Sequence, residues 1–170
     1  MIYYLLLTAS GGIVGAGSVQ ERPIPANCIE CTQSEAETWP TLEIVNGTIQ
    51  EIPAAQLLAQ AKTTQRALIK SSFLSASTAN VTDSKGIVWE GGMQSGNSIF
   101  LGCQLAQQAG QTTITLYDAS KAPHSMTIAE GMGVAALIGT AYQEALAKKN
   151  TLYANIDAAK SVSEVQSVTW

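Results

Sequence analysis

The residues best suited to chemistry in this chain are its three cysteines and its one histidine. Cys28 and Cys31 form a C-x-x-C pair, and Cys103 with His124 would complete a Cys₃His set of the kind that binds zinc. The spacing within the pair suits a metal, but the other two ligands are single residues far along the chain. One alternative is that Cys28 and Cys31 form a redox dithiol, but no thioredoxin-like context follows them. The other is that Cys28 and Cys31 are small strand residues and Cys103 is a buried core thiol. We favour the last, and expect no metal and no cofactor.

Two further patterns have the residue types of an active or nucleotide-binding site. Asp118, His124 and Ser125 could supply a hydrolase triad, but no nucleophile elbow accompanies them, and sequence neighbours seldom form a triad. We expect His124 to be a turn residue that bonds the backbone before a helix. The glycines of 12–17 have dinucleotide-loop spacing, but they lie in an expected hairpin with a Pro-rich connector after it. We therefore predict that the protein is not an enzyme.

Composition excludes several other classes of function. With 46% hydrophobic and 13% charged residues, the chain should form a globular core. One Arg and six Glu give residues 1–53 a charge of −5, residues 54–85 carry +3 and residues 86–170 carry −2, which makes −4 in all. An acidic molecule with one short basic region is poorly suited to nucleic acid. No run approaches the ~20 apolar residues of a membrane span, and the apolar start Met1–Val19 lacks the basic segment of a signal peptide.

The strongest helix signal is Ala54–Leu74, which begins directly after Pro53. Its apolar residues recur at helical spacing and form one stripe. Cations at every fourth position form a basic ridge beside the stripe: Lys62, Arg66 and Lys70. The ridge is either a solvated helix edge or a docking surface for an acidic partner, such as residues 1–53 of a second copy. The stripe is also broad enough for self-association, so a homo-oligomer is a further expectation.

The other patterns predict an α+β protein in three parts: a β-rich N-terminal hairpin region (1–53), a connecting helix (54–75) and a small mixed α/β C-terminal domain (76–170). In the first part, Asn46-Gly47 is typical of a type I′ hairpin turn. Further expected elements are strands at Ile2–Ala9, Ile13–Val19, Cys28–Thr32, Gly86–Trp89 and Thr112–Tyr117, a helical turn at Ser34–Glu37 and a helix at Asn97–Ala109.

A capping-box pattern at Thr127–Glu130 opens another helix, which should reach about Lys149 and end on two lysines. Gly131, Gly133 and Gly139 interrupt it, and glycines kept in a helix indicate that another backbone comes close. We expect a separate helix at Leu152–Ala159 and a last turn opened by Ser161.

A family resemblance is found in residues 86–170. G-I-V-W-E-G-G-M-x-S at Gly86–Ser95 precedes S-I-F-L-G-C-Q-L-A-Q-Q-A-G at Ser98–Gly110, and I-D-A-A-x-S-V-S-E-V follows at Ile156–Val165. This order resembles a conserved C-terminal domain of tail-fibre-associated proteins of tailed bacteriophages and prophages. The opening Y-Y-L-L-L-T-A-S-G-G-I-V-G at Tyr3–Gly15 is similar to the β-rich front end of small phage proteins of that architecture.

The resemblance implies a tail-fibre assembly protein, either a chaperone or a fibre-tip cap, that covers apolar fibre surface in the host cytoplasm while the shaft assembles. The alternative is a permanent structural or receptor-binding component of the virion tail-fibre tip. Trp89, in a strand, should be a core residue. We expect contacts with the fibre from the stripe, the ridge and two tryptophans: Leu57, Leu58, Lys62, Arg66, Leu68, Lys70, Trp39 and Trp170.

Overall fold

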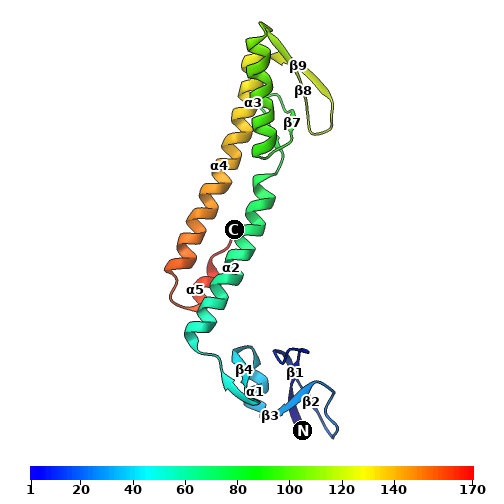
Figure 1. Cartoon of the computed structure of the whole chain (residues 1–170), viewed down its shortest axis with the longest axis vertical. Coiled ribbons are helices and arrows are strands. Elements are labelled where there is room, and N and C mark those ends of the chain that lie inside the picture. The colour runs from blue at the N-terminus through cyan, green and yellow to red at the C-terminus, as the bar shows by residue number, and fades with distance from the viewer. The chain divides into compact units, whose positions relative to one another are not determined.

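The structure, a computed structural model, describes residues 1–170 and confirms the α+β class (Figure 1). The chain has two compact units, residues 1–60 and 61–170. The sequence instead suggested borders after residues 53 and 75. The border lies inside helix α2 (Ala54–Ser77), because the residues of this helix from Ala61 onward belong with the C-terminal helices.

The first unit contains an antiparallel sheet with strand order β2-β1-β3. Leu5 lies in the central strand and is fully buried. A bulge interrupts the pairing of β1 with β2, where Leu6 faces Gly15 but Leu7 faces Ile13. The three strands are β1 (Ile2–Leu7), β2 (Ile13–Val19) and β3 (Cys28–Cys31).

Two short helical elements and a hairpin complete the first unit. Helix α1 (Gln33–Thr38) begins one residue before the predicted Ser34, because Thr32 and Glu35 form a capping box. The 3₁₀ helix η1 (Trp39–Thr41) leads into the predicted hairpin, β4 (Leu42–Val45) and β5 (Thr48–Glu51). Asn46 and Gly47 have φ of 52° and 79°, which confirms a turn with two left-handed residues.

The second unit combines helices with two small hairpins. Helix α3 (Met93–Gln108) packs against the first half of α4 (Ile128–Ala158), and the hairpins lie beside this pair (Figure 1). Strand β9 was not predicted, and its partner β8 was. The remaining elements are β6 (Val81–Thr82), β7 (Val88–Trp89), β8 (Thr113–Tyr117), β9 (Pro123–Thr127) and α5 (Val162–Ser167).

Helix α4 confirms the predicted start and corrects the predicted end. The Thr127 hydroxyl accepts a hydrogen bond from the Glu130 amide at 3.2 Å, and the Glu130 carboxylate accepts one from the Thr127 amide at 2.8 Å. The helix then runs to Ala158 without interruption, so the separate helix expected at Leu152–Ala159 is wrong. Nothing between Lys149 and Leu152 breaks a helix, since neither Gly nor Pro occurs there.

The core of the second unit lies between the α3–α4 pair and the hairpins. Its buried centre comprises Trp89, Leu116, Met126, Val134 and Ile138. The strand residue Trp89 is thus a core residue, as predicted. The glycines of α3 and α4 have three kinds of surroundings. Gly96 and Gly131 face the other helix closely, Gly102 faces Ile114 of β8, and Gly133 and Gly139 face open space.

Gly131 confirms the expected close approach, and Gly133 and Gly139 do not. A Cβ on Gly131 would lie 2.7 Å from the Cys103 sulfur on α3. On the α3 side, a Cβ on Gly96 would lie 3.2 Å from an Ile138 methyl group. Nothing lies within 4 Å of the corresponding positions on Gly133 and Gly139. The close contact between α3 and α4 therefore depends on Gly96 and Gly131.

Gly131→Ala should lower the free energy of unfolding by about 1 to 3 kcal/mol, because the added methyl group collides with a fully buried thiol. Gly133→Ala is the matched control and should raise it by up to about 1 kcal/mol, since alanine favours the helix and meets open space. Urea unfolding followed by circular dichroism measures both. Equal effects would show that α3 and α4 are not in close contact at Gly131.

Candidate interaction surfaces

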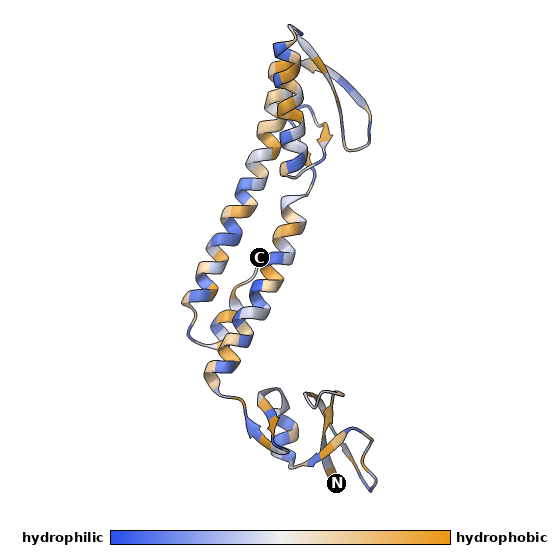
Figure 2. Ribbon diagram, viewed as in Figure 1, coloured by the Kyte–Doolittle hydropathy of each residue, from blue (hydrophilic) through white to orange (hydrophobic).

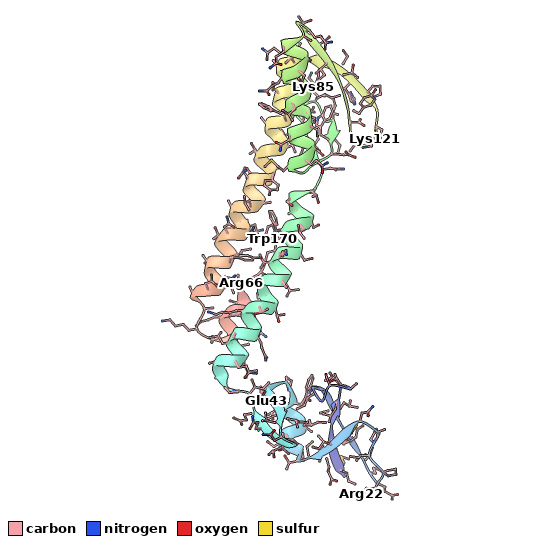
Figure 3. All side chains as sticks on the ribbon, in the orientation of Figure 1. Arg22, Glu43, Arg66, Lys85, Lys121 and Trp170 are labelled. Atoms are coloured by element: carbon pink, nitrogen blue, oxygen red, sulfur yellow. The ribbon has the colours of Figure 1, made fainter.

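Two members of the expected basic ridge make contacts within the chain. Lys62 Nζ donates to the backbone oxygen of Asp157 at 2.8 Å. Arg66 donates to both carboxylate oxygens of Asp157, at 2.5 and 2.6 Å, and lies over the ring of Tyr153. Only Lys70 is left as an exposed cation without an ion pair. The ridge predicted as a docking surface is therefore mostly a joint between α2 and α4 (Figure 3).

The apolar stripe of α2 is divided between core and surface. Ile69 and Phe73 are buried, and the Phe73 ring meets Tyr142 of α4 edge to face at 6.0 Å. Leu68, assigned to the same stripe, is 56% exposed. Leu57 and Leu58 are half-buried near the start of the helix. Long side chains, rather than close backbones, join α2 to α4.

The two tryptophans predicted as contact residues are half-buried. Trp39 lies in η1, which is close to β2 in the first unit. Trp170 lies under the Lys148 ammonium group, 4.8 Å from the ring centre, and faces a hollow lined by small residues of α2 (Figure 3). Trp170 thus fastens the C-terminus within the second unit. Its predicted role in fibre binding remains a prediction.

Ile69→Ala should lower the free energy of unfolding by about 2 to 5 kcal/mol, because it leaves a cavity in a buried site. Leu68→Glu, one position along, should stay within about 0.5 kcal/mol of the wild type because its side chain is in water. Chemical denaturation measures both variants. Loss of folding in the Leu68→Glu variant would place that leucine in the core instead.

The cysteines do not form a joint site. Successive residues of a strand face opposite sides of the sheet, so Cys28 and Cys31, three positions apart in β3, point to opposite faces. Burial raises the pKa of the Cys31 thiol, and the negative charges of Glu35 and Glu30 raise it further, which disfavours a reactive thiolate. Cys103 is buried against Gly131 of α4. The geometry therefore supports small strand residues and a core thiol.

His124 and Asp118 come together across the β8–β9 hairpin, with no nucleophile between them. His124 Nε2 lies 2.9 Å from an Asp118 carboxylate oxygen, and its ring meets Trp89 edge to face. Ser125 follows in the same strand and so faces the opposite side, which rules out the imagined triad. The expected turn position of His124 is wrong, because residues 123–127 form a strand.

Asp118 organises the hairpin turn. Its carboxylate accepts bonds from the Ser120 hydroxyl at 2.7 Å and from the amides of Ser120 and Ala122 at 2.8 and 2.9 Å. The hydrogen bond from His124, followed by the one from Ser120, holds the pKa of Asp118 well below its usual range. This arrangement gives the pair a structural role: it closes the turn and places His124 against the core tryptophan.

A second acidic residue ties the β6–β7 turn to the start of α4. Lys85 Nζ lies 2.6 Å from the Glu130 carboxylate, which also serves the capping box of Thr127. The bond from Lys85 and then those from Thr127 lower the pKa of Glu130 from 4.5 to about 2. In the same turn, Asp83 accepts a bond from the indole nitrogen of Trp89 at 2.9 Å.

Because the pKa of Glu130 is lower in the folded protein, the unfolded chain takes up this proton first as the pH falls. Stability should therefore decline as the pH falls from 4.5 to about 2. In Glu130→Gln, unfolding free energies at about pH 5 and about pH 3 should differ less than in the wild type. Glu144→Gln, an exposed site later in α4, should retain the wild-type difference. A Glu130→Gln variant as acid-sensitive as the wild type would contradict this assignment.

An exposed apolar surface that the sequence reasoning missed lies over α3 and the first half of α4. Phe100, Leu101 and Leu105 of α3 are 43%, 55% and 65% exposed. Beside them a groove between the two helices is lined by Met93, Asn97, Phe100, Met132, Ala136 and Gly139. The sequence signal that could have indicated this surface was the absence of charge, because residues 91–117 and 131–143 contain no Asp, Glu, Lys or Arg. Figure 2 shows this part of α4 as orange and pale, with more blue toward its end.

The first unit also has a strand edge without a backbone hydrogen-bond partner, although η1, α1 and β4 lie close to this strand. β2 is an edge strand, carries no charged residue and includes Val14, which is 56% exposed. No backbone hydrogen bond joins it to any segment other than β1. The opposite edge, β3, carries Glu30, which forms an ion pair with Arg22. Charges at an edge oppose pairing with another strand, so β2 is the more receptive edge.

These features define an α+β protein of two folded units, with an unpaired strand edge in the first and an exposed apolar surface in the second. Comparisons with protein-family models, with curated proteins and with solved structures found no match to this chain. None of its helices has the length and apolar character needed to cross a membrane.

Proposed function

We propose that this chain is a tail-fibre assembly protein of a tailed bacteriophage or prophage, and that it binds the fibre in the host cytoplasm. The resemblance of residues 86–170 to tail-fibre-associated domains supports the choice of partner. The observation that carries the binding role is the unpaired, uncharged edge of β2 in the first unit.

An edge strand with free backbone groups can accept an extended segment of another chain as an added strand. The middle of β2 consists of small residues, Gly15, Ala16 and Gly17, and the Leu6 and Tyr4 side chains of β1 lie over the two glycines. Trp39 lies in η1 close to this strand and can add apolar contact beside the added segment. This retains one of the residues expected from the sequence to contact the fibre.

Binding of this kind suits an assembly role. Before a long trimeric fibre closes, its chains expose apolar surface and unpaired strand edges, and both promote aggregation. A second protein that pairs with such a segment through β2 keeps it soluble until the other fibre chains replace it. The backbone supplies most of the hydrogen bonds, so the contact does not require a matching charge on the fibre.

Co-expression of this chain with a tail-fibre protein of the same phage or prophage tests the proposal. Soluble trimeric fibre should form with the wild type and should be lost to aggregates when Val14→Lys places a charge on the β2 edge. Val45→Lys is the matched control, since Val45 is also an exposed valine of the first unit but lies in the β4–β5 hairpin. The yield of trimer is measured by size-exclusion chromatography.

The possible outcomes test the assembly role, the β2 assignment and the alternative function separately. Fibre that is soluble and trimeric without this chain would overturn the assembly role. Rescue by Val14→Lys equal to that by the wild type would overturn the β2 assignment alone. Stoichiometric presence of the chain in purified virions would favour the alternative, a permanent component of the fibre tip.

A further inference from the structure

The apolar surface over α3 and α4 has two parts of complementary shape. The convex part is a ridge formed by Leu101 and Leu105, which project from α3 and are more than half exposed. The concave part is the groove between α3 and α4, whose lining includes Met93, Met132 and Gly139. Both parts lie within one helix width of each other, because Phe100 borders the groove and Leu101 is the next residue.

This surface departs from ordinary solvated surface in its lack of charge. Exposed leucines are normal when single, but here Leu101 and Leu105 lie one turn apart on α3, and Phe100 is exposed beside them on the side of the groove. The central parts of protein interfaces are depleted in charged residues, and neither 91–117 nor 131–143 has any.

We propose that this surface binds the same surface of a second copy of the chain, related by a two-fold axis. In a two-fold contact each feature meets its counterpart in both directions, so the partner must present a ridge where this chain has a groove. The α3–α4 surface carries both features side by side. With α3 antiparallel to its copy, Leu101 and Leu105 of one chain enter the groove of the other, over Gly139.

Charge supports a copy as the partner. The chain has a net charge of −4, so two copies repel weakly wherever charged surfaces face one another. A surface without ionisable groups can meet itself without that repulsion. The nearby charges of α4 lie elsewhere: Glu130 is held by Lys85, and Glu144 comes after the uncharged segment.

The area of the α3–α4 surface indicates how strongly two copies should bind each other. α3 has 16 residues, so it is about 24 Å long, and two adjacent helices about 10 Å wide give a footprint of roughly 500 Å² per chain. Stable dimers usually bury about 800 Å² per partner. The dimer should therefore be reversible, with a dissociation constant in the micromolar range or weaker.

This contact differs from the self-association expected through α2. Leu68 of α2 is as exposed as Leu101 of α3, but its neighbours Arg66 and Lys70 are cations, and Ile69 and Phe73 of the same stripe are already buried. The two leucines provide a matched pair, since the same substitution is made at equal exposure on different helices.

Sedimentation equilibrium on the full chain, from low micromolar to several hundred micromolar, tests the proposal. The wild type and Leu68→Glu should pass from monomer to dimer as the concentration rises. Leu101→Glu should weaken the dimer at least about tenfold, because it places two charges against apolar surface near the axis. Circular dichroism checks that each variant is folded.

A wild type that stays monomeric throughout, or a Leu101→Glu variant that dimerises like the wild type, would overturn the proposal. A trimer or larger assembly would overturn the two-fold arrangement. Loss of the dimer in Leu68→Glu, with Leu101→Glu unaffected, would assign self-association to α2 instead. None of these outcomes depends on whether the chain binds a fibre.

Discussion

The close contact between α3 and α4 is the constraint on which the second unit depends. It is possible because Gly131 leaves room for the Cys103 sulfur and Gly96 leaves room for Ile138. With the two helices this close, Val134 and Ile138 form one wall of a core that the β6–β7 and β8–β9 hairpins close from the other side through Trp89 and Leu116. The same contact brings Phe100 and Met132 to the two borders of a single groove.

Charged residues of the second unit are used mainly to fix element ends. The last carbonyl groups of a helix lack partners within it and carry partial negative charge. At the end of α4, Lys62 of α2 donates to one such carbonyl oxygen, that of Asp157, and Arg66 donates to the Asp157 carboxylate. The pair is exposed and so contributes little energy, on the order of 1 kcal/mol or less. Its effect is to fix where α4 ends beside α2.

Local signals in the sequence were enough for most elements of this fold. Asn46-Gly47 and the capping box of Thr127 act within a few residues, and both are found as predicted. The end of α4 was misplaced because Lys148 and Lys149 were taken as C-terminal charges. They lie in mid-helix, where Lys148 covers Trp170 and Lys149 covers Phe73. Such contacts join residues far apart in the chain, so the periodicity of a single segment cannot predict them.

The candidate surfaces were harder to predict for the same reason. Helical spacing says that Leu68 and Ile69, or Phe100 and Cys103, lie near one face, but a buried face is narrower than the stripe that spacing defines. The neighbouring element that packs on the stripe determines which of its residues are buried and which stay exposed to solvent. Tyr142 of α4 covers Phe73 and leaves Leu68 in water, whereas α4 covers Cys103 and leaves Leu101 exposed. The sequence shows that residues 91–117 contain no charged residue, but only the fold shows which of these residues are exposed together on one surface.

The two open surfaces of the chain differ in what they can bind, and this limits how they can act together. A strand edge binds through backbone groups and accepts many sequences in extended form, whereas a ridge and groove on helices bind through side-chain shape and accept few. The β2 edge therefore suits a changing partner that is released when its own strands pair. The α3–α4 surface suits a fixed partner such as a second copy. If both proposals hold, dimerisation joins two edge strands in one particle, and a multi-chain fibre end meets more than one binding edge at a raised effective concentration. Each edge can then bind weakly enough to release its strand while the particle as a whole stays attached.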